Sequence, residues 1–427
     1  MLILAGAFTL TGLILLALVN AQSTDLWTPA LPSSGAVLII DHWSLLIAFL
    51  VWLIVFGTLP VYLNRRLPAR DPFILPIVAL LTGWGLIEIA RLAPNFLGRQ
   101  VIWLIVSAVA LILVVSAPAH LRWLRRYRYT WLFFGLILLA LTFVIGVNPE
   151  GVGLREWLGG VGGVFFQPSE MMKLLLVVFL ASYLAEKRDV ASSLRLEQRH
   201  ILTRPYLAPL LAMWGVALIL VLAQQDIGTA ILLYLSFLVM LYLASGQARY
   251  MAVGLVLMVV AVVGGYLLIG RVQGRINTWL NPWADPAGSS YQIVQSLIAQ
   301  GSGGLIGSGL GQGYPDVILP AVHTDMPLAA IGEEFGLIGT LAVIACFTLL
   351  TLRGLQAAAT ARTAFGQLLA AGLAASIGLQ AWTIMAGNAN LIPLTGVTLP
   401  FISYGGSSLL ISFLAIGLLL HISADRD

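Results

Sequence analysis

The sequence predicts an all-α polytopic membrane protein, and three observations lead to that prediction. The chain of 427 residues is 59% hydrophobic and only 9% charged, with a mean hydropathy of +0.97, a composition far from that of soluble domains. Apolar runs near the ~20 residues needed to cross a bilayer recur along the whole chain. Most loops between these runs are short, which is typical of a bundle of antiparallel helices.

Twelve apolar runs have the character of membrane spans. They lie at about residues 1–20, 44–62, 73–90, 101–118, 130–147, 171–184, 206–223, 228–246, 251–270, 327–352, 366–387 and 396–421. The first run lacks the basic start of a secretory signal, although Val19-Asn20-Ala21 resembles a small-residue cleavage site. We therefore interpret it as an uncleaved helix.

The distribution of basic residues predicts the orientation. One alternate set of loops carries 16 Lys and Arg residues and the other set carries 5, and basic residues are retained on the cytoplasmic side. This places the C-terminus of the multi-pass protein in the cytoplasm. The net charge of +4 reflects this asymmetry and does not indicate a nucleic-acid partner.

The sequence shows no clear pattern of metal ligands or of paired cysteines. The single cysteine, Cys346, lies inside a span, and the five histidines show no ligand spacing. No cofactor is certain from these residues, and a divalent cation stays open.

Two outer segments exceed the usual loop length, residues 148–170 and 271–326, and long loops are usually functional. Apolar residues from Tyr291 to Ile298 recur at helical spacing, which predicts a short helix lying on the outer surface. The glycine-rich stretch 301–313 matches neither a Walker A loop nor a GxGxxG fingerprint. It is interpreted either as backbone that approaches a ligand closely or as a flexible hinge.

Ionisable residues within spans cost about 2.5–3.5 kcal/mol each at the bilayer centre, so each should be paired or line a wet cavity. The candidates are Glu88 with Arg91, Glu170 with Lys173, Asp226, and Glu333 with Glu334. Internal ion pairs and functional sites both remain open for them. Asp325 differs, because it follows a loop and precedes Pro327 at the outer mouth, where a carboxylate can stay ionised and reachable.

Two function classes fit these charges. One is a transporter or flippase with carboxylates along a pathway. The other is an outward-facing enzyme that acts on a lipid-linked substrate, with the base supplied by the long outer loop.

Five motifs in order resemble the SEDS family of shape, elongation, division and sporulation proteins, typified by FtsW and RodA. They are FFQPSEMMK (165–173), QQDIGTA (224–230), NPWADPAGSSYQIVQSLIAQGSGGLIGSGLGQG (281–313), HTDMPLAAIGEEFG (323–336) and LTGVTLPFISYGGSSLL (394–410). The resemblance implies a ten-helix domain over residues 71–427. Residues 1–70 then form two additional N-terminal transmembrane helices with a linker, which the family pattern does not explain.

This resemblance implies a peptidoglycan glycosyltransferase of the bacterial inner membrane that joins lipid II into glycan strands on the outer face, alongside a class B penicillin-binding protein transpeptidase. It assigns the catalytic aspartate to Asp325. The chain departs from the family at Met326-Pro327-Leu328, where Phe-Ile-Phe is usual, and at Gln225, where proline is usual. The first departure bears on the helix start beside the proposed base.

Glycan transfer needs a base for the attacking 4-hydroxyl but no acid for a pyrophosphate leaving group. Asp285 and Asp316 share the long loop and are chemical rivals of Asp325. Arg271 and Arg275 are the expected pyrophosphate ligands, with Arg91, Arg99 and Arg155 as further candidates, although anionic lipid headgroups would suit these arginines equally. The remaining substrate-binding candidates are Glu170, Lys173, Asp226, Ser403, Tyr404 and Ser407, the last three in a Gly- and Ser-rich segment that either lines a substrate cavity or packs helices closely.

Overall fold

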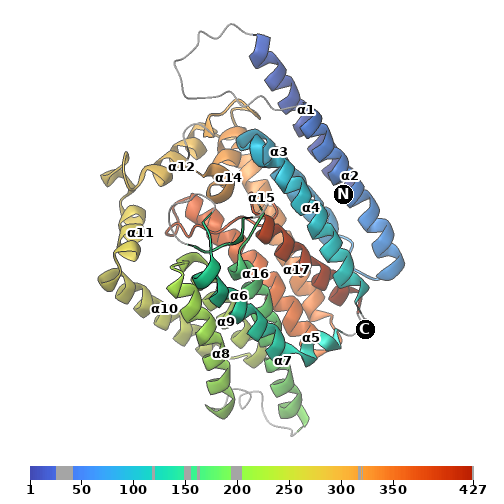
Figure 1. Cartoon of the computed structure of the whole chain (residues 1–427), viewed down its shortest axis with the longest axis vertical. Coiled ribbons are helices and arrows are strands. Elements are labelled where there is room, and N and C mark those ends of the chain that lie inside the picture. The colour runs from blue at the N-terminus through green and yellow to red at the C-terminus, as the bar shows by residue number, and fades with distance from the viewer. Residues whose placement is uncertain are drawn as a thin grey trace.

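The computed structural model describes residues 1–25, 42–117, 121–148, 155–160, 164–193, 204–315, 319 and 321–425. Within these residues the protein is a helical bundle (Figure 1). The long helices are α1 (Leu2–Asp25), α2 (His42–Arg66), α3 (Ile74–Leu92), α4 (Pro94–Ser116), α6 (Arg128–Ile145), α7 (Pro168–Ser193), α8 (Arg204–Ala223), α9 (Ile227–Ser245), α10 (Ala248–Leu268), α15 (Pro327–Ala359), α16 (Ala364–Asn388) and α17 (Gly406–Ala424). Eleven of them are long and apolar enough to span a membrane, and α8 contributes a shorter apolar stretch at 208–223. The predicted all-α membrane architecture is confirmed.

Short elements occupy the connections. They are α5 (Arg122–Arg126), β1 (Leu158–Gly159), β2 (Phe165–Phe166), α11 (Gly270–Leu280), the 3₁₀ turn η3 (Pro282–Ala284), α12 (Tyr291–Ser302) and α14 (Val322–Asp325). Strands β1 and β2 form a small antiparallel hairpin with Leu158 opposite Phe166. The surface helix expected after Tyr291 is present as α12, and it buries Ile293 and Val294 as it packs against α15.

Burial separates the central helices from the peripheral ones. In α7, 94% of the most apolar window is buried, whereas in α10 only 6% is buried. Helices α3, α16 and α17 resemble α7 in this respect, and α6 resembles α10. Apolar side chains around α10 and α6 therefore face lipid, while polar groups on α7 must find partners inside the protein.

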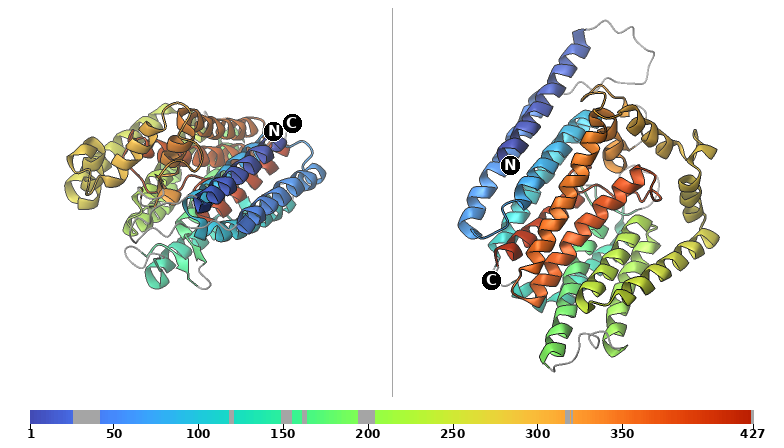
Figure 2. Two further views of the ribbon diagram at one scale, coloured as in Figure 1. Left: turned by 90° about the horizontal axis from the view of Figure 1, so that it is seen from above. Right: turned by 180° about the vertical axis from the view of Figure 1, so that it is seen from behind.

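The two N-terminal helices form an added layer beside α3 and α4 (Figure 2). The indole of Trp52 on α2 donates a hydrogen bond to the carbonyl of Ala79 at 3.1 Å. Helix α1 lies so close to α3 that a Cβ at Gly83 would sit 2.0 Å from the hydroxyl of Thr9. This contact depends on the absence of a side chain at Gly83.

The bundle has two unlike ends (Figure 1). We call the end with α11, α12 and α14 the site end, because it carries Asp325. The opposite end, which carries α5 and the C-terminus, we call the arginine-rich end. The described segment with α5, which carries many basic residues, and the described segment with α11, α12 and α14, which carries few, thus lie at opposite ends of the bundle.

Two of the last three spans differ from the sequence expectation. The final helix begins at Gly406 and not near residue 396, because residues 396–405 form turns in which Phe401 has a φ of 67°. Helix α15 is broken at Gly336, which has φ 65° and ψ −161°. A break of this kind inside a span needs other groups to satisfy the freed backbone.

The glycine-rich stretch 301–313 supplies those groups. Backbone N–H groups of Ser308 and Gly309 donate to the carbonyls of Glu333 (2.9 Å) and Glu334 (3.0 Å). Beyond the break, Leu337 N–H donates to Gly304 O at 2.9 Å and Ile338 N–H to Leu305 O at 3.2 Å. A Cβ at Gly303 would lie 1.9 Å from Gly332 O. The glycines therefore let this segment approach the backbone of α15, which neither of the two sequence interpretations anticipated.

Candidate functional site

Asp325 occupies the junction between α14 and α15. Helix α14 ends at Asp325, and α15 begins two residues later with Pro327 at its first turn, so the structure keeps this junction despite the Met-Pro-Leu sequence. Asn388, fully buried at the end of α16, donates from Nδ2 to Asp325 O at 2.8 Å and accepts from Leu328 N at 3.2 Å. One buried amide thus fixes the backbone on both sides of the junction and leaves the half-buried carboxylate of Asp325 outside this pair of bonds.

The irregular segment before α17 supports the same junction from the other side. Ser403 Oγ donates to Thr324 O at 2.7 Å and accepts from Leu399 N at 2.9 Å. The backbone N–H of Tyr404 donates to His323 O at 2.8 Å. Ser403 and Tyr404, predicted as substrate ligands, therefore hold the turn that carries Asp325.

Three aromatic side chains pack beside the turn that carries Asp325. The Phe96 ring lies 4.6 Å from that of Tyr404 and 5.3 Å from that of His323, between ring centroids. Arg99 lies 5.7 Å over Phe96 and hydrogen-bonds the Tyr404 side chain. This arrangement places a cation from α4 beside the site as well.

A cluster of opposite charges lies at the site end. Burial lowers the pKa of Arg275 on α11, and so does the neighbouring Arg271, while the carboxylates of Asp226, Asp325 and Glu156 oppose that shift. Arg275 also donates to Thr395 O at 3.4 Å and Arg271 to Gln225 Oε1 at 3.1 Å. Of the two arginines predicted to bind pyrophosphate, Arg275 therefore lies within electrostatic reach of the predicted base, and Arg271 is its neighbour in the cluster.

Glu156 belongs to this cluster and was missed by the sequence analysis. It lies in the outer segment just before the β1–β2 hairpin. Burial raises its pKa to about 7, the negative charge of Asp226 adds to the rise, and Arg271 and Arg275 oppose it. The available signal was an acid beside Arg155 and Trp157 in a segment already expected to be functional.

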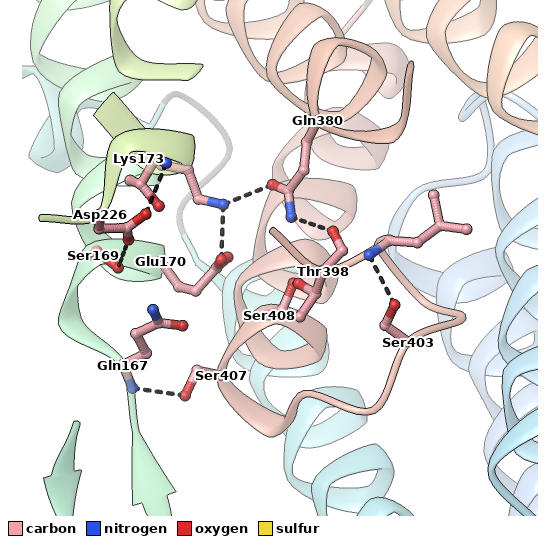
Figure 3. Close-up of polar contacts among 12 residues, drawn as sticks. Gln167, Ser169, Glu170, Lys173, Asp226, Gln380, Thr398, Ser403, Ser407 and Ser408 are labelled. Carbon is pink, nitrogen blue, oxygen red and sulfur yellow. Dashed lines mark hydrogen bonds and ion pairs between the residues drawn. The ribbon is translucent and has the colours of Figure 1, made fainter. Parts of the chain in front are cut away.

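Asp226 caps α9 and ties it to α7. Its Oδ1 accepts from Thr229 N at 3.0 Å, and its Oδ2 accepts from Ser169 Oγ at 3.4 Å (Figure 3). A carboxylate at a helix N-cap is favourable because it satisfies a free N–H and interacts with the helix dipole. Asp226 thus has a structural task in addition to its charge in the cluster.

Glu170 and Lys173 form the predicted ion pair inside the bundle. Lys173 Nζ lies 2.8 Å from Glu170 Oε1 and donates to Gln380 Oε1 at 2.7 Å, and both charged residues are buried (Figure 3). Gln380 Nε2 then donates to Thr398 O at 2.9 Å. The network links α7 through α16 to the segment that supports Asp325.

A small cavity adjoins this network. It has a volume of about 30 Å³ and is lined by Glu170, Lys173 and Gln380 among apolar residues, which is room for one or two waters. Nearby, Ser407 Oγ accepts from Gln167 N at 2.9 Å, and Thr398 Oγ1 bonds Ser408 Oγ at 2.8 Å (Figure 3). Ser407 is therefore engaged in holding the start of α7 to α17.

The deeper glutamates have hydrogen-bond partners, two of them from distant elements. Arg91 donates from Nε to Glu334 Oε1 at 3.0 Å and from Nη2 to Gly313 O at 2.8 Å. Glu88 accepts from Trp84 Nε1 at 3.3 Å, and Glu333 Oε1 accepts from Tyr314 N at 2.9 Å. The Arg91–Glu334 pair joins α3 to α15, a partnership that the three-residue spacing of Glu88 and Arg91 did not suggest.

The rival aspartates differ from Asp325. The carboxylate of Asp285 accepts from Ser289 N at 2.8 Å and Ser289 Oγ at 3.0 Å, and these bonds, the backbone one first, lower its pKa at the exposed surface. It stabilises a turn. Asp316 lies outside the described residues. In the part of the chain that the structure describes, no three His, Cys, Asp or Glu side chains converge as metal ligands.

Comparison with known proteins identifies the family. A family model described as "Cell cycle protein", built for FtsW, RodA and SpoVE, matches residues 74–427. The chain belongs to this SEDS family. Peptidoglycan glycosyltransferase RodA of Mycobacterium tuberculosis is 39% identical, with 95% of this chain and 90% of that protein covered. Probable peptidoglycan glycosyltransferase FtsW of Geobacter sulfurreducens is 37% identical over 77% of this chain and 85% of its own length.

Solved structures of SEDS proteins share the fold. One, from a study titled "Structural coordination of polymerization and crosslinking by a peptidoglycan synthase complex", matches with a TM-score of 0.68 and 26% identity, covering 84% of this chain and 98% of that chain. RodA of Thermus thermophilus matches with a TM-score of 0.61 and 26% identity, covering 84% and 97%. The family model begins at the start of α3, after α1 and α2.

Proposed function

We propose that this peptidoglycan glycosyltransferase polymerises lipid II on the outer face of the bacterial inner membrane. The observation that carries this proposal is the arrangement at the site end, where Asp325, held at its backbone by Asn388, shares one charge cluster with Arg275 and its neighbour Arg271. The names of the chain's relatives, peptidoglycan glycosyltransferases, support a substrate of peptidoglycan synthesis.

The reaction needs these two kinds of group. The 4-hydroxyl oxygen of the acceptor sugar attacks the anomeric carbon of the donor, and the bond from that carbon to the undecaprenyl pyrophosphate oxygen breaks. Asp325 takes the hydroxyl proton, which a poor nucleophile must lose during attack. The pyrophosphate leaves with the bonding electrons and is stabilised by positive charge, so it needs no proton.

Arg271 and Arg275 would supply that charge. Guanidinium groups bind phosphate oxygens in pairs of parallel hydrogen bonds. Arg275 is half-buried and Arg271 exposed, so the pair extends from the protein surface toward the carboxylates. This placement suits a headgroup that enters from the membrane interface while its lipid stays in the bilayer.

The deciding experiment uses purified protein and lipid II, with and without a class B penicillin-binding protein. Such a partner is suggested by the structural neighbour from a peptidoglycan synthase complex. Glycan polymer should appear on gels and disappear when lipid II is omitted. If proteoliposomes instead show movement of lipid II between leaflets without any polymer, the transport alternative replaces this proposal.

Replacing both Arg271 and Arg275 with alanine should lower kcat/KM for lipid II by about 10- to 100-fold. A hydrogen bond to a charged group contributes about 1.5–3 kcal/mol. Losing one such bond in the transition state lowers kcat/KM by about 10- to 100-fold. Initial rates across lipid II concentrations measure the effect. Arg249→Ala, which removes a cation from the arginine-rich end, is the control and should leave the rate unchanged. Equal turnover by the double variant and the parent would contradict a role in pyrophosphate binding.

The KM for lipid II should rise about two- to fivefold between pH 6 and pH 8. Glu156, with its pKa raised to about 7, is protonated below that pH and leaves the arginines to the substrate. Above pH 7 the ionised carboxylate repels the pyrophosphate. The repulsion is modest because the carboxylate is partly solvated. Glu156→Gln should remove this rise while kcat at pH 6 stays near that of the parent. A rise of the same size in Glu156→Gln would assign the pH dependence to another group.

A further inference from the structure

A second charged site lies at the arginine-rich end, far from Asp325. It is a pocket of about 340 Å³ lined by Arg122, Arg125, Arg126, Arg128 and Glu186, which we call the arginine pocket. Four guanidinium groups and one carboxylate give its lining a net charge of +3. The four guanidinium groups repel one another. An anion that enters the pocket is attracted by all four and reduces this repulsion.

The local fold builds the pocket from two directions. Leu121, with a left-handed φ of 44°, turns the chain after α4 and starts α5, whose buried Leu124 anchors it against the bundle. Spacings of three and four residues place Arg122, Arg125 and Arg126 on one side of this short helix. Arg128, the first residue of α6, forms an ion pair with Glu186 of α7 and donates to Ser182 O at 3.4 Å. The carboxylate in the lining is therefore already matched by Arg128.

We propose that the arginine pocket binds the phosphate-bearing headgroup of an anionic phospholipid. Arginine is suited to this task because its fork of donors pairs with phosphate oxygens. Basic pockets beside the ends of membrane helices are sites of this kind. The expected ligand is a phospholipid of the leaflet that faces this end of the protein.

The surroundings favour a lipid over a soluble anion. The pocket lies where the apolar helix α6 begins, the level at which headgroups lie. Exposed Tyr127 and Tyr129 and the paired indoles of Trp123 and Trp131, 5.4 Å between ring centroids, flank the arginines. Such aromatic residues favour the membrane interface.

The surface of α6 also continues from the pocket as an apolar path. Phe133, Phe134 and Ile137 are 64%, 46% and 46% exposed and follow Arg128 along the outside of the bundle. Acyl chains of a lipid seated in the pocket would cover these side chains. A soluble phosphate or nucleotide would leave them in contact with other lipid and gain nothing from them.

The consequence is stabilisation of the α5–α6–α7 corner. A ligand that binds only the folded protein raises its thermal stability in proportion to its occupancy. Through Arg128 and Glu186 the headgroup would brace α7, the helix that carries Glu170 and Lys173 nearer the site end. The proposal does not depend on the glycosyltransferase reaction, because the pocket and the site end share no residue.

The test compares lipid binding by the full chain and two triple variants in neutral detergent. Native mass spectrometry and thermal unfolding would be measured with phosphatidylglycerol, with phosphatidylcholine and with inorganic pyrophosphate alone. The test variant is Arg122→Gln/Arg125→Gln/Arg126→Gln. The control, Arg65→Gln/Arg66→Gln/Arg249→Gln, loses the same charge from the same end outside the pocket.

Phosphatidylglycerol should stabilise the parent and the control, and phosphatidylcholine should not. Each arginine near anionic lipid changes affinity about fivefold, so the test variant should bind roughly a hundredfold more weakly. Should the triple variant fail to fold, the exposed single variant Arg126→Gln should still bind about fivefold more weakly than the parent. Equal losses in test and control variants, equal binding of both lipids, or full stabilisation by pyrophosphate without lipid would each overturn the proposal.

Discussion

Asp325→Asn should lower lipid II polymerisation by about a hundredfold or more. Asparagine keeps the shape of the side chain but cannot accept the proton of the attacking hydroxyl, and a positioned base contributes roughly 10²–10⁴-fold. The supporting bonds from Asn388 and Ser403 reach backbone carbonyls of Asp325 and Thr324, so the substitution leaves them in place. Polymer formed per minute from lipid II by equal amounts of purified protein measures the effect.

The matched control for this change is Asp285→Asn. It removes a carboxylate charge from the same outer segment, and the amide oxygen of asparagine can still accept the bonds from Ser289. Membrane insertion, thermal unfolding and binding of the transpeptidase should match the parent in both variants. If Asp325→Asn polymerises near the parental rate and Asp285→Asn does not, the base has been assigned to the wrong carboxylate.

Lys173→Met should lower the free energy of unfolding by about 3–5 kcal/mol. The substitution removes the cation 2.8 Å from Glu170 and the donor to Gln380, and breaking a buried ion pair leaves an uncompensated charge, with a cost of this size. Thermal unfolding in detergent, followed by fluorescence, provides the measurement. Activity should fall as well, because Gln380 holds Thr398 in the segment that supports Asp325.

The double variant Glu170→Gln/Lys173→Met separates structure from function for this pair. With both charges removed, no buried charge is left unpaired, so most of the lost stability should return. If polymerisation returns with it, the pair is structural. If the double variant is stable but inactive, the charges act on the substrate or on Asp325. A single variant as stable as the parent would refute the importance of the network.

Much of the architecture followed from local sequence. Spans depend on the length and hydrophobicity of continuous segments, so eleven long apolar helices and the shorter apolar stretch in α8 appear near their expected positions. The Glu170–Lys173 pair was predictable too, because residues three apart share a helix face. The start of the last span was predicted wrongly from local sequence. Turns around Phe401 precede the helix, which begins only at Gly406. An apolar run alone does not reveal whether its backbone is helical.

The function of the glycine-rich stretch lay beyond local pattern for a different reason. Its glycines are required by the backbone of α15, which is broken at Gly336 and hydrogen-bonded to Gly304, Ser308 and Gly309. Nothing in either segment by itself names the other as its partner. The same holds for Arg91, whose bond to Glu334 spans 243 positions of the chain.

The sequence by itself determined a polytopic helical membrane protein, its family, and Asp325 as the candidate base, because these depend on composition, motif order and residue chemistry. Only the tertiary structure decided that Glu156 joins Asp226, Arg271 and Arg275 in one charge cluster with Asp325. It also decided that Ser403 and Tyr404 hold the turn that carries Asp325. The physical reason is that charge interactions and hydrogen bonds depend on distance in space, and packing of helices remote in sequence sets that distance.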